Sequence, residues 1–167
     1  SDVDLSDTES LIINDNGNQK EENWNTLSNK FEDAWLSVFK GDQSKMNDLM
    51  KNSQKLQWEN PLISDFNELK EGWDNFAQFF QDPTLIIYSK SKNDQGKIEL
   101  DFQLSFWYPI FWRPRIIIPG KAIIECNSDY TSIIGVKEEW ELTLSDIVLK
   151  QLLPRFWDIW HLYSSPP

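Results

Sequence analysis

Alternation of apolar and polar side chains over residues 98–106 is the feature that most restricts what this chain can fold into. Polar residues fill every position between the apolar ones, which are Ile98, Leu100, Phe102, Leu104 and Phe106. Successive side chains of a strand point to opposite faces of a sheet, so this period of two predicts a strand with one buried face. Such a strand needs further strands beside it and a second layer to cover its apolar face.

Helical periodicity in the first half of the chain predicts that second layer. Apolar residues over 24–39 recur at spacings of three and four, which is the stripe of an amphipathic helix, and Lys40-Gly41 is a typical helix end. Shorter stretches with the same spacing predict helices over 44–52 and 66–80, the latter capped by Ser64 or Asp65 and closed by Asp82-Pro83. A short alternating stretch predicts a strand over 56–61.

The remainder of the chain reads mainly as strands. Besides 98–106, strands are expected at residues 85–88, 116–126 and 130–143, with a bulge or bend at Pro119-Gly120. Residues 144–153 are expected to form a helix that stops at Pro154. Helices that precede a run of strands predict an α+β fold, in which the helices pack on one face of a curved antiparallel sheet.

Charge is concentrated at the N-terminus. Residues 1–23 hold seven acidic residues and one basic residue, so this stretch supplies −6 of the net charge of −11, and it contains no aromatic residue. A segment that buries so little apolar surface is expected to form an extended arm over 1–22, either solvated or docked on a partner through Leu11, Ile12 and Ile13. We expect the domain to span 23–153 and an aromatic C-terminal arm to span 154–167.

Composition excludes several classes of function. The acidic balance argues against nucleic-acid binding, which needs clustered Lys and Arg. Cys126 and His161 are the only residues of their types, so the chain cannot form an internal disulfide, a cysteine-rich zinc site or a site with two histidines. No apolar run approaches the ~20 residues of a membrane-spanning helix. We therefore expect no metal, no cofactor and no transmembrane segment, with peripheral association to a membrane complex left open.

Four sequence pieces resemble one superfamily. They are Trp58-Glu59-Asn60-Pro61, the stretch 109–114 (PIFWRP) with Pro119-Gly120 after it, Glu138-Glu139-Trp140-Glu141, and the stretch 146–151 (DIVLKQ). Their order resembles the nuclear transport factor 2-like (NTF2-like) cone of ketosteroid isomerases and polyketide cyclases, and more narrowly a branch found in plants and algae. The resemblance implies a cone-shaped α+β fold over 24–153 and a plastid location; the mitochondrion and the cytoplasm are the alternatives. The chain begins at Ser1 rather than Met, as a processed or trimmed chain does.

Glu138 is the candidate catalytic residue. Alternation over 130–143 puts it on an otherwise apolar face, formed by Ile134, Val136, Trp140 and Leu142. An apolar setting favours the protonated carboxyl, as a general acid or base near neutral pH needs. The alternative is a half-buried carboxylate paired with Lys121, Lys137 or an arginine.

The resemblance suggests further residues for this site, and one residue that it implies is missing from this chain. In polyketide-cyclase relatives, an aspartate two residues before the tryptophan and a histidine four residues before it are site candidates. Here these positions hold Glu138 and Val136, so the histidine is absent, and Asn60-Pro61 stands where the family has Asp-Pro. Residues expected to line the pocket are Trp58, Asn60, Val136 and Trp140.

Aromatic residues with two arginines form the candidate partner-binding surface. The hairpin end carries Trp107, Tyr108, Phe111, Trp112, Arg113 and Arg115, and the C-terminal segment carries Trp157 and Trp160. Trp, Tyr and Arg dominate binding hot spots, although the same side chains could simply close the hairpin end over the core. Asp158 and His161 could form a dyad, but docking is the preferred role for their segment. Cys126 is expected to be a small apolar filler.

These observations support two functions. The preferred one is a non-catalytic assembly module that docks into a larger complex through its terminal arms and aromatic hairpin. A photosynthetic complex of a plastid is the candidate for that larger complex. The alternative is a small-molecule-binding protein, or an isomerase or cyclase, with Glu138 as acid or base in a hollow cone. That alternative requires a cavity of several hundred Å³ lined by Glu138, Trp140 and Trp58.

Overall fold

The chain forms helices first and a sheet second. The computed structural model describes residues 5–51 and 56–153, and of residues 5–16 it describes only the backbone. The first elements are α1 (Leu5–Phe39), α2 (Ser44–Met50), β1 (Gln57–Glu59) and α3 (Phe66–Phe79). They are followed by β2 (Gln81–Lys92), β3 (Ile98–Trp107), β4 (Arg115–Cys126), β5 (Ile133–Trp140), α4 (Leu144–Asp146) and the π-helix η1 (Ile147–Leu152). The predicted α+β class is confirmed.

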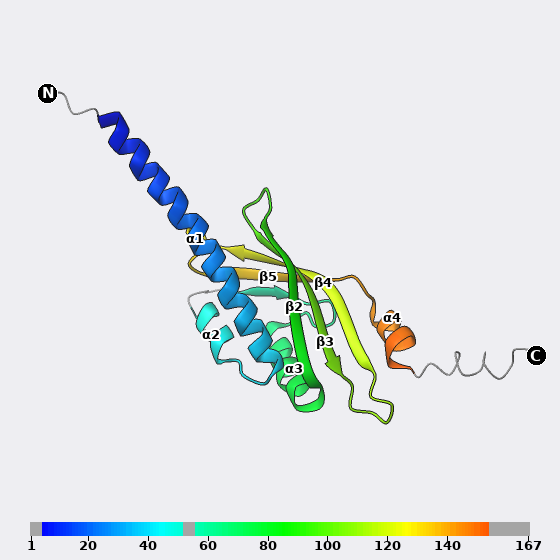
Figure 1. Ribbon diagram of the computed structural model, residues 1–167. Coiled ribbons are helices and arrows are strands. Elements are labelled where there is room, and N and C mark those ends of the chain that lie inside the picture. Colours follow the sequence, from blue (N-terminus) through cyan, green and yellow to red (C-terminus); the bar gives the residue numbers. More distant parts are fainter. Residues whose placement is uncertain (1–4, 52–55, 154–167) are drawn as a thin grey trace, which may run out of the picture.

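The five strands form one mixed sheet in the order β1-β5-β4-β3-β2. All neighbours are antiparallel except β1 and β5, which run parallel with Trp58 opposite Val136. The expectation of a wholly antiparallel sheet was therefore wrong at this edge. The residues between β1 and β5 include a helix and three strands, so no hairpin dictates their relative direction. In Figure 1, β2 and β3 run steeply whereas β5 and β1 run across them, which shows how strongly the sheet twists.

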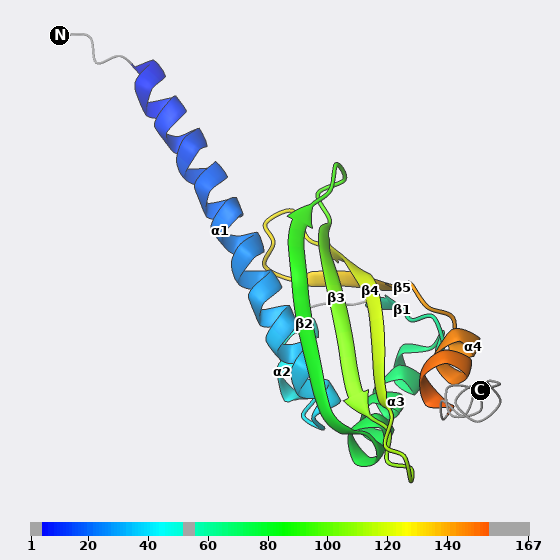
Figure 2. The same cartoon turned by 45° about the vertical axis from the view of Figure 1, so that its right-hand side comes forward.

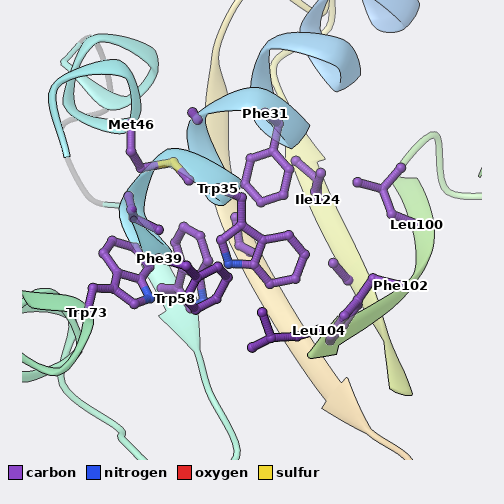
Figure 3. Packing of buried hydrophobic residues seen from close by; sticks show 14 of the residues in the cluster. Phe31, Trp35, Phe39, Met46, Trp58, Trp73, Leu100, Phe102, Leu104 and Ile124 are labelled. Atoms are coloured by element: carbon purple, nitrogen blue, oxygen red, sulfur yellow. The ribbon is translucent and has the colours of Figure 1, made fainter. Parts of the chain in front are cut away.

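Helices α1, α2 and α3 cover the concave face of this sheet (Figure 2). The predicted apolar stripe of α1 packs against β3, and the ring centroids of Trp35 and Phe102 lie 4.8 Å apart. Figure 3 shows Phe31 and Trp35 of α1 facing the side chains of β3, with Met46 of α2 at the other end of the cluster. The core is therefore the contact between the two layers that the two periodicities predicted.

Helix α1 begins far earlier than expected. Residues 1–22 were predicted to form an extended arm, but the helix starts at Leu5, so Leu11, Ile12 and Ile13 lie in a helix and not in a docking strand. Once a helix is anchored, as α1 is by the packing of its second half, each further residue adds a hydrogen bond without a new nucleation cost. The early part of α1 projects away from the domain in both views (Figures 1 and 2).

β2, predicted over 85–88, and β5, predicted over 130–143, differ most from their predicted limits. β2 begins at Gln81, so Asp82-Pro83 lies inside a strand, where the pairing register with β3 shifts between Gln81 and Thr84. β5 pairs with β4 through a second register shift between Glu125 and Cys126. Because of this irregularity Ile133 is buried and Ile134 is exposed, contrary to the predicted face.

Gly120 is required by a close approach between strands. A Cβ atom at this position would lie 2.5 Å from the carbonyl oxygen of Glu139 and 2.8 Å from the ring of Phe102. The pairing of β4 with β3 continues through Pro119 and Gly120 without a register shift, so the expected bulge is absent from this pair. The glycine instead lets the Phe102 ring lie directly over β4.

Candidate functional site

A cavity of about 360 Å³ lies between α3 and the concave face of the sheet. Side chains from α1, the loop after β1, α3, β3 and β5 line it, and they include Phe39, Asn60, Trp73, Phe76, Phe102 and Trp140. Most of the lining is apolar. The polar members of the lining are Asn60, Asn75 and Glu138 of β5, and Glu138 is the only ionisable residue among the described residues that line the cavity.

Glu138 is 7% exposed and is held by three N–H donors. Its Oε2 atom accepts hydrogen bonds from Trp58 Nε1 at 2.7 Å and from Asn60 Nδ2 at 2.8 Å. Its Oε1 atom has a single long contact, 3.5 Å from Trp140 Nε1. One carboxylate oxygen is therefore fully engaged, whereas the other keeps free acceptor capacity.

The environment of Glu138 acts on its pKa in two directions. Burial in the apolar interior raises the pKa above the ordinary glutamate value, because removal from water penalises the charged form. Hydrogen bonds from Asn60, Trp58 and Trp140 act against this rise, since all three donate to the carboxylate. Burial outweighs them, and the net direction is upward.

No described lysine or arginine compensates the charge of Glu138. The predicted alternative pairing with Lys121 or Lys137 is wrong, because these side chains pair with Glu99 at 3.7 Å and with Glu139 at 3.4 Å. The alternation along β5 is the reason, since Lys137 is exposed while Glu138 is buried.

Asn60 is oriented by the chain that follows it. Its Oδ1 atom accepts the backbone N–H groups of Leu62 at 2.9 Å and Ile63 at 3.3 Å. The Nδ2 atom is thereby left to face Glu138. An aspartate here would keep the turn but would place a second carboxylate against Glu138, so the Asn60-Pro61 departure from the family pattern suits the acid on β5.

The four residues expected to line the pocket lie in different places. Asn60 and Trp140 line the cavity. Trp58 is buried behind Glu138 and reaches it through its indole N–H. Val136 is buried and borders a second, more polar groove, together with Gln57 and Lys97.

Aromatic residues of α3 form the wall that sequence reasoning missed. Trp73, Phe76 and Phe79 of α3 and Phe80 directly after it line the cavity. The helical spacing identified Trp73, Phe76 and Phe80 only as part of an apolar stripe, and Phe79 was not singled out. The Phe76 ring packs edge-on against Phe106 at 4.8 Å. The signal that could have found the wall was the density of aromatic residues over 66–80, which exceeds what one helix stripe needs.

The hairpin end is partly folded onto the domain. Tyr108 packs against Phe79 and Phe80, so it supports the cavity wall. The guanidinium groups of Arg113 and Arg115 lie 5.9 and 5.1 Å from the centroid of the Trp107 ring. Both arginines also donate hydrogen bonds to neighbouring strands: Arg113 to Gln81 at 2.9 Å, and Arg115 to Ser105 at 2.8 Å.

Two aromatic residues of the hairpin end remain exposed. Phe111 is 99% exposed, and Trp112 is 45% exposed although its indole N–H donates to the carbonyl of Leu152 at 2.8 Å. Of the other predicted partner contacts, Trp157 and Trp160 lie outside the described residues, as do Asp158 and His161. Burial raises the pKa of the half-buried Cys126 thiol to about 12, so it is not a reactive thiolate.

The arrangement around Glu138 can bind an apolar molecule and can accept or hold one proton. Nucleophilic side chains and a second ionisable group are missing from the described lining. Three or more metal-ligating His, Cys, Asp or Glu side chains do not gather anywhere among the described side chains, those of residues 17–51 and 56–153. No helix within residues 5–51 and 56–153 is both long enough and apolar enough to span a membrane.

Comparison with known proteins identifies the fold. Neither family models nor curated proteins match the sequence. Among solved structures, an NTF2-like protein of unknown function from Exiguobacterium sp. 255-15 is similar, with a TM-score of 0.50 and 14% identity over 66% of this chain and 98% of that one. A protein described as a SnoaL-like polyketide cyclase, from Shewanella denitrificans OS-217, has a TM-score of 0.58 and 9% identity over 76% of this chain and 97% of that one. The chain therefore has the α+β cone fold of NTF2-like proteins, as the resemblance predicted.

Proposed function

We propose that this chain binds a small, mainly apolar molecule inside the cone, with Glu138 as its polar contact. The observation that carries the proposal is a buried carboxyl at the wall of an apolar cavity of about 360 Å³. Ligand sites are typically concave, apolar and equipped with a few placed polar groups. The proposal corresponds to the second of the two functions considered from the sequence.

A chemical step at this site would be a proton transfer. Glu138 can take a proton from a bound molecule or return one, as an isomerase or cyclase of this fold would require. The described lining offers no second proton carrier, and Val136 stands where relatives have a histidine. Binding is therefore the core of the proposal, and single-proton acid–base chemistry is its extension.

Binding can be tested with 2-(2-naphthyl)ethanol, a neutral aromatic probe, followed by calorimetry and by protein NMR. We expect saturable binding that is lost in Leu104→Trp, because this substitution puts a larger ring into the cavity wall. Ile117→Trp is the matched control: Ile117 is exposed and does not line this cavity. Equal binding by the wild type and Leu104→Trp, with Leu104→Trp folded by circular dichroism, would refute the proposal.

A second candidate function is assembly into a larger complex, which the exposed hairpin end supports. Trp112, Ile117, Leu142 and Leu153 help to line a groove of about 520 Å³, and Phe111, the residue before Trp112, is exposed. We further propose, from the sequence pieces that resemble it, that the chain belongs to the plant and algal branch and works in a plastid. Assembly predicts that Phe111→Ser, or removal of residues 156–167, weakens co-purification of partners from the native source. Unchanged partners after both changes would contradict the assembly function. A fluorescent fusion found outside plastids would contradict the proposed location.

A further inference from the structure

The charge of Glu138 has no partner of opposite sign in the described part of the chain. The side chains that face it from β1, β5 and the loop after β1 are Trp58, Trp140 and Asn60, which are neutral donors. The cavity side chains from α1, α3 and β3 are not ionisable either. A buried carboxylate is stabilised far more by an opposite charge than by neutral donors alone, so this site favours a ligand that brings a cation.

The free acceptor capacity of Glu138 lies on one oxygen. Oε2 accepts two short hydrogen bonds, whereas Oε1 has only the contact of 3.5 Å to Trp140. The two short donors require Oε2 to be unprotonated, because a proton on that oxygen would compete with both Trp58 and Asn60. The oxygen with free capacity therefore offers one strong acceptor position to a ligand N–H.

The cavity walls suit a cation as well. Rings from four elements line the cavity, and they are Phe39, Trp73, Phe76, Phe80, Phe102 and Trp140. The faces of aromatic rings attract cations, and an aromatic pocket is a common recognition site for ammonium groups. The described lining holds no lysine or arginine that could bind an anionic ligand.

We propose that the natural ligand is a monocationic amine with an apolar or aromatic body, whose ammonium group pairs with Glu138 Oε1 while its body lies against the rings of α3 and β3. The cavity of about 360 Å³ has room for about a dozen non-hydrogen atoms, at the roughly 30 Å³ that a water molecule occupies in the liquid. A primary alkylamine is protonated at neutral pH, since its pKa resembles that of lysine. This inference rests on the proposed function, because it names the class of molecule that the same cavity takes.

The test compares three probes with one ring system and different charges. They are 2-(2-naphthyl)ethylamine, 2-(2-naphthyl)ethanol and 2-naphthaleneacetate, each titrated by calorimetry at pH 7.5. Hydrogen bonds to charged groups contribute enough that the amine should bind ~10- to 100-fold more tightly than the alcohol. The carboxylate should bind more weakly than the alcohol, because it meets the like charge of Glu138.

Glu138→Gln tests whether this preference comes from the carboxylate. We expect the amine to lose its advantage and bind within about threefold of the alcohol, whose own affinity stays similar. Glu139→Gln is the matched control: it removes an equal charge from the next residue of β5, which faces away from the cavity and pairs with Lys137 at 3.4 Å. It should keep the preference of the wild type.

The outcomes separate this inference from the proposed function. If the wild type binds amine and alcohol equally, or if Glu138→Gln keeps the preference for the amine, the amine inference is refuted while cavity binding stands. If none of the three probes binds saturably, the proposed function is refuted and the inference fails with it. The wild-type comparison needs no variant, so the inference remains testable even if Glu138→Gln does not fold.

Discussion

Replacing Asn60 with aspartate tests the central contact of the site with a change of one group. The Asn60→Asp side chain keeps an oxygen for the backbone N–H groups of Leu62 and Ile63, which Asn60 Oδ1 accepts at 2.9 and 3.3 Å. It loses the amide donor that lies 2.8 Å from Glu138 Oε2. The substitution therefore spares the turn and exchanges a favourable contact for a carboxylate facing a carboxylate.

The expected cost follows from these contacts. A hydrogen bond to a charged group contributes about 1.5–3 kcal/mol, and the unpaired buried charge makes the loss at least this large at neutral pH. For a chain of this size, 1 kcal/mol corresponds to roughly 2–4 °C in Tm, so Asn60→Asp should melt about 3–12 °C below the wild type. At acid pH the two carboxyls share a proton, which restores a donor between them, so the difference should shrink.

Thermal unfolding followed by circular dichroism at pH 7.5 and pH 4.5 measures both effects. Asn75→Asp is the matched control, because Asn75 also lines the cavity but is exposed and makes no described hydrogen bond to Glu138. This control should melt within about 2 °C of the wild type, as surface substitutions do. An Asn60→Asp protein as stable as the wild type at pH 7.5, or one whose deficit grows in acid, would refute our account of the site.

Three further predictions address the same fold. Burial raises the pKa of Glu138 above its unfolded value, so the contribution of this carboxyl to stability is most favourable at low pH and is lost as pH rises from the ordinary glutamate pKa through the raised one. Glu138→Gln lacks this loss, and its free energy of unfolding in urea should gain on that of the wild type by up to about 1.4 kcal/mol per pH unit in that window. A constant difference between the two proteins would contradict the assignment. Gly120→Ala puts a methyl group 2.8 Å from the Phe102 ring and should cost about 1–3 kcal/mol in the same assay; a change below 0.5 kcal/mol, on the order of a surface substitution, would show that β4 yields easily. Gln151→Ala removes the side-chain amide that bonds both the N–H and the carbonyl of Ile117, at 2.6 and 2.8 Å, and should cost about 1–2 kcal/mol, with faster amide hydrogen exchange at Ile117; unchanged exchange there would contradict this role.

Local patterns predicted the elements well where one face of each is buried. The alternation over 98–106 and the apolar stripe over 24–39 correspond to β3 and to the packed half of α1. Prediction failed where the deciding interactions are not local. The polar start of α1 is helical although its composition indicated an extended arm, and the register shift beside Cys126 moved Ile134 off the buried face of β5.

The candidate site shows the same division. The sequence alone identified Glu138 as an acid on an apolar strand face, because strand alternation is a local property. It also excluded a two-histidine site and a disulfide, which depend only on composition. The sequence alone therefore determined the helical and sheet layers, the class of fold and the identity of the acidic residue, Glu138.

Only the tertiary structure decided what surrounds that acid. Trp58 lies eighty residues before Glu138 in the chain, and the parallel pairing of β1 with β5 brings their side chains within 2.7 Å. The aromatic wall of α3 and the absence of a described cation beside Glu138 likewise depend on how distant elements pack. Periodicity reports which face of an element is buried, but it carries no information about which other element that face will meet, and the chemistry of this site depends on that meeting.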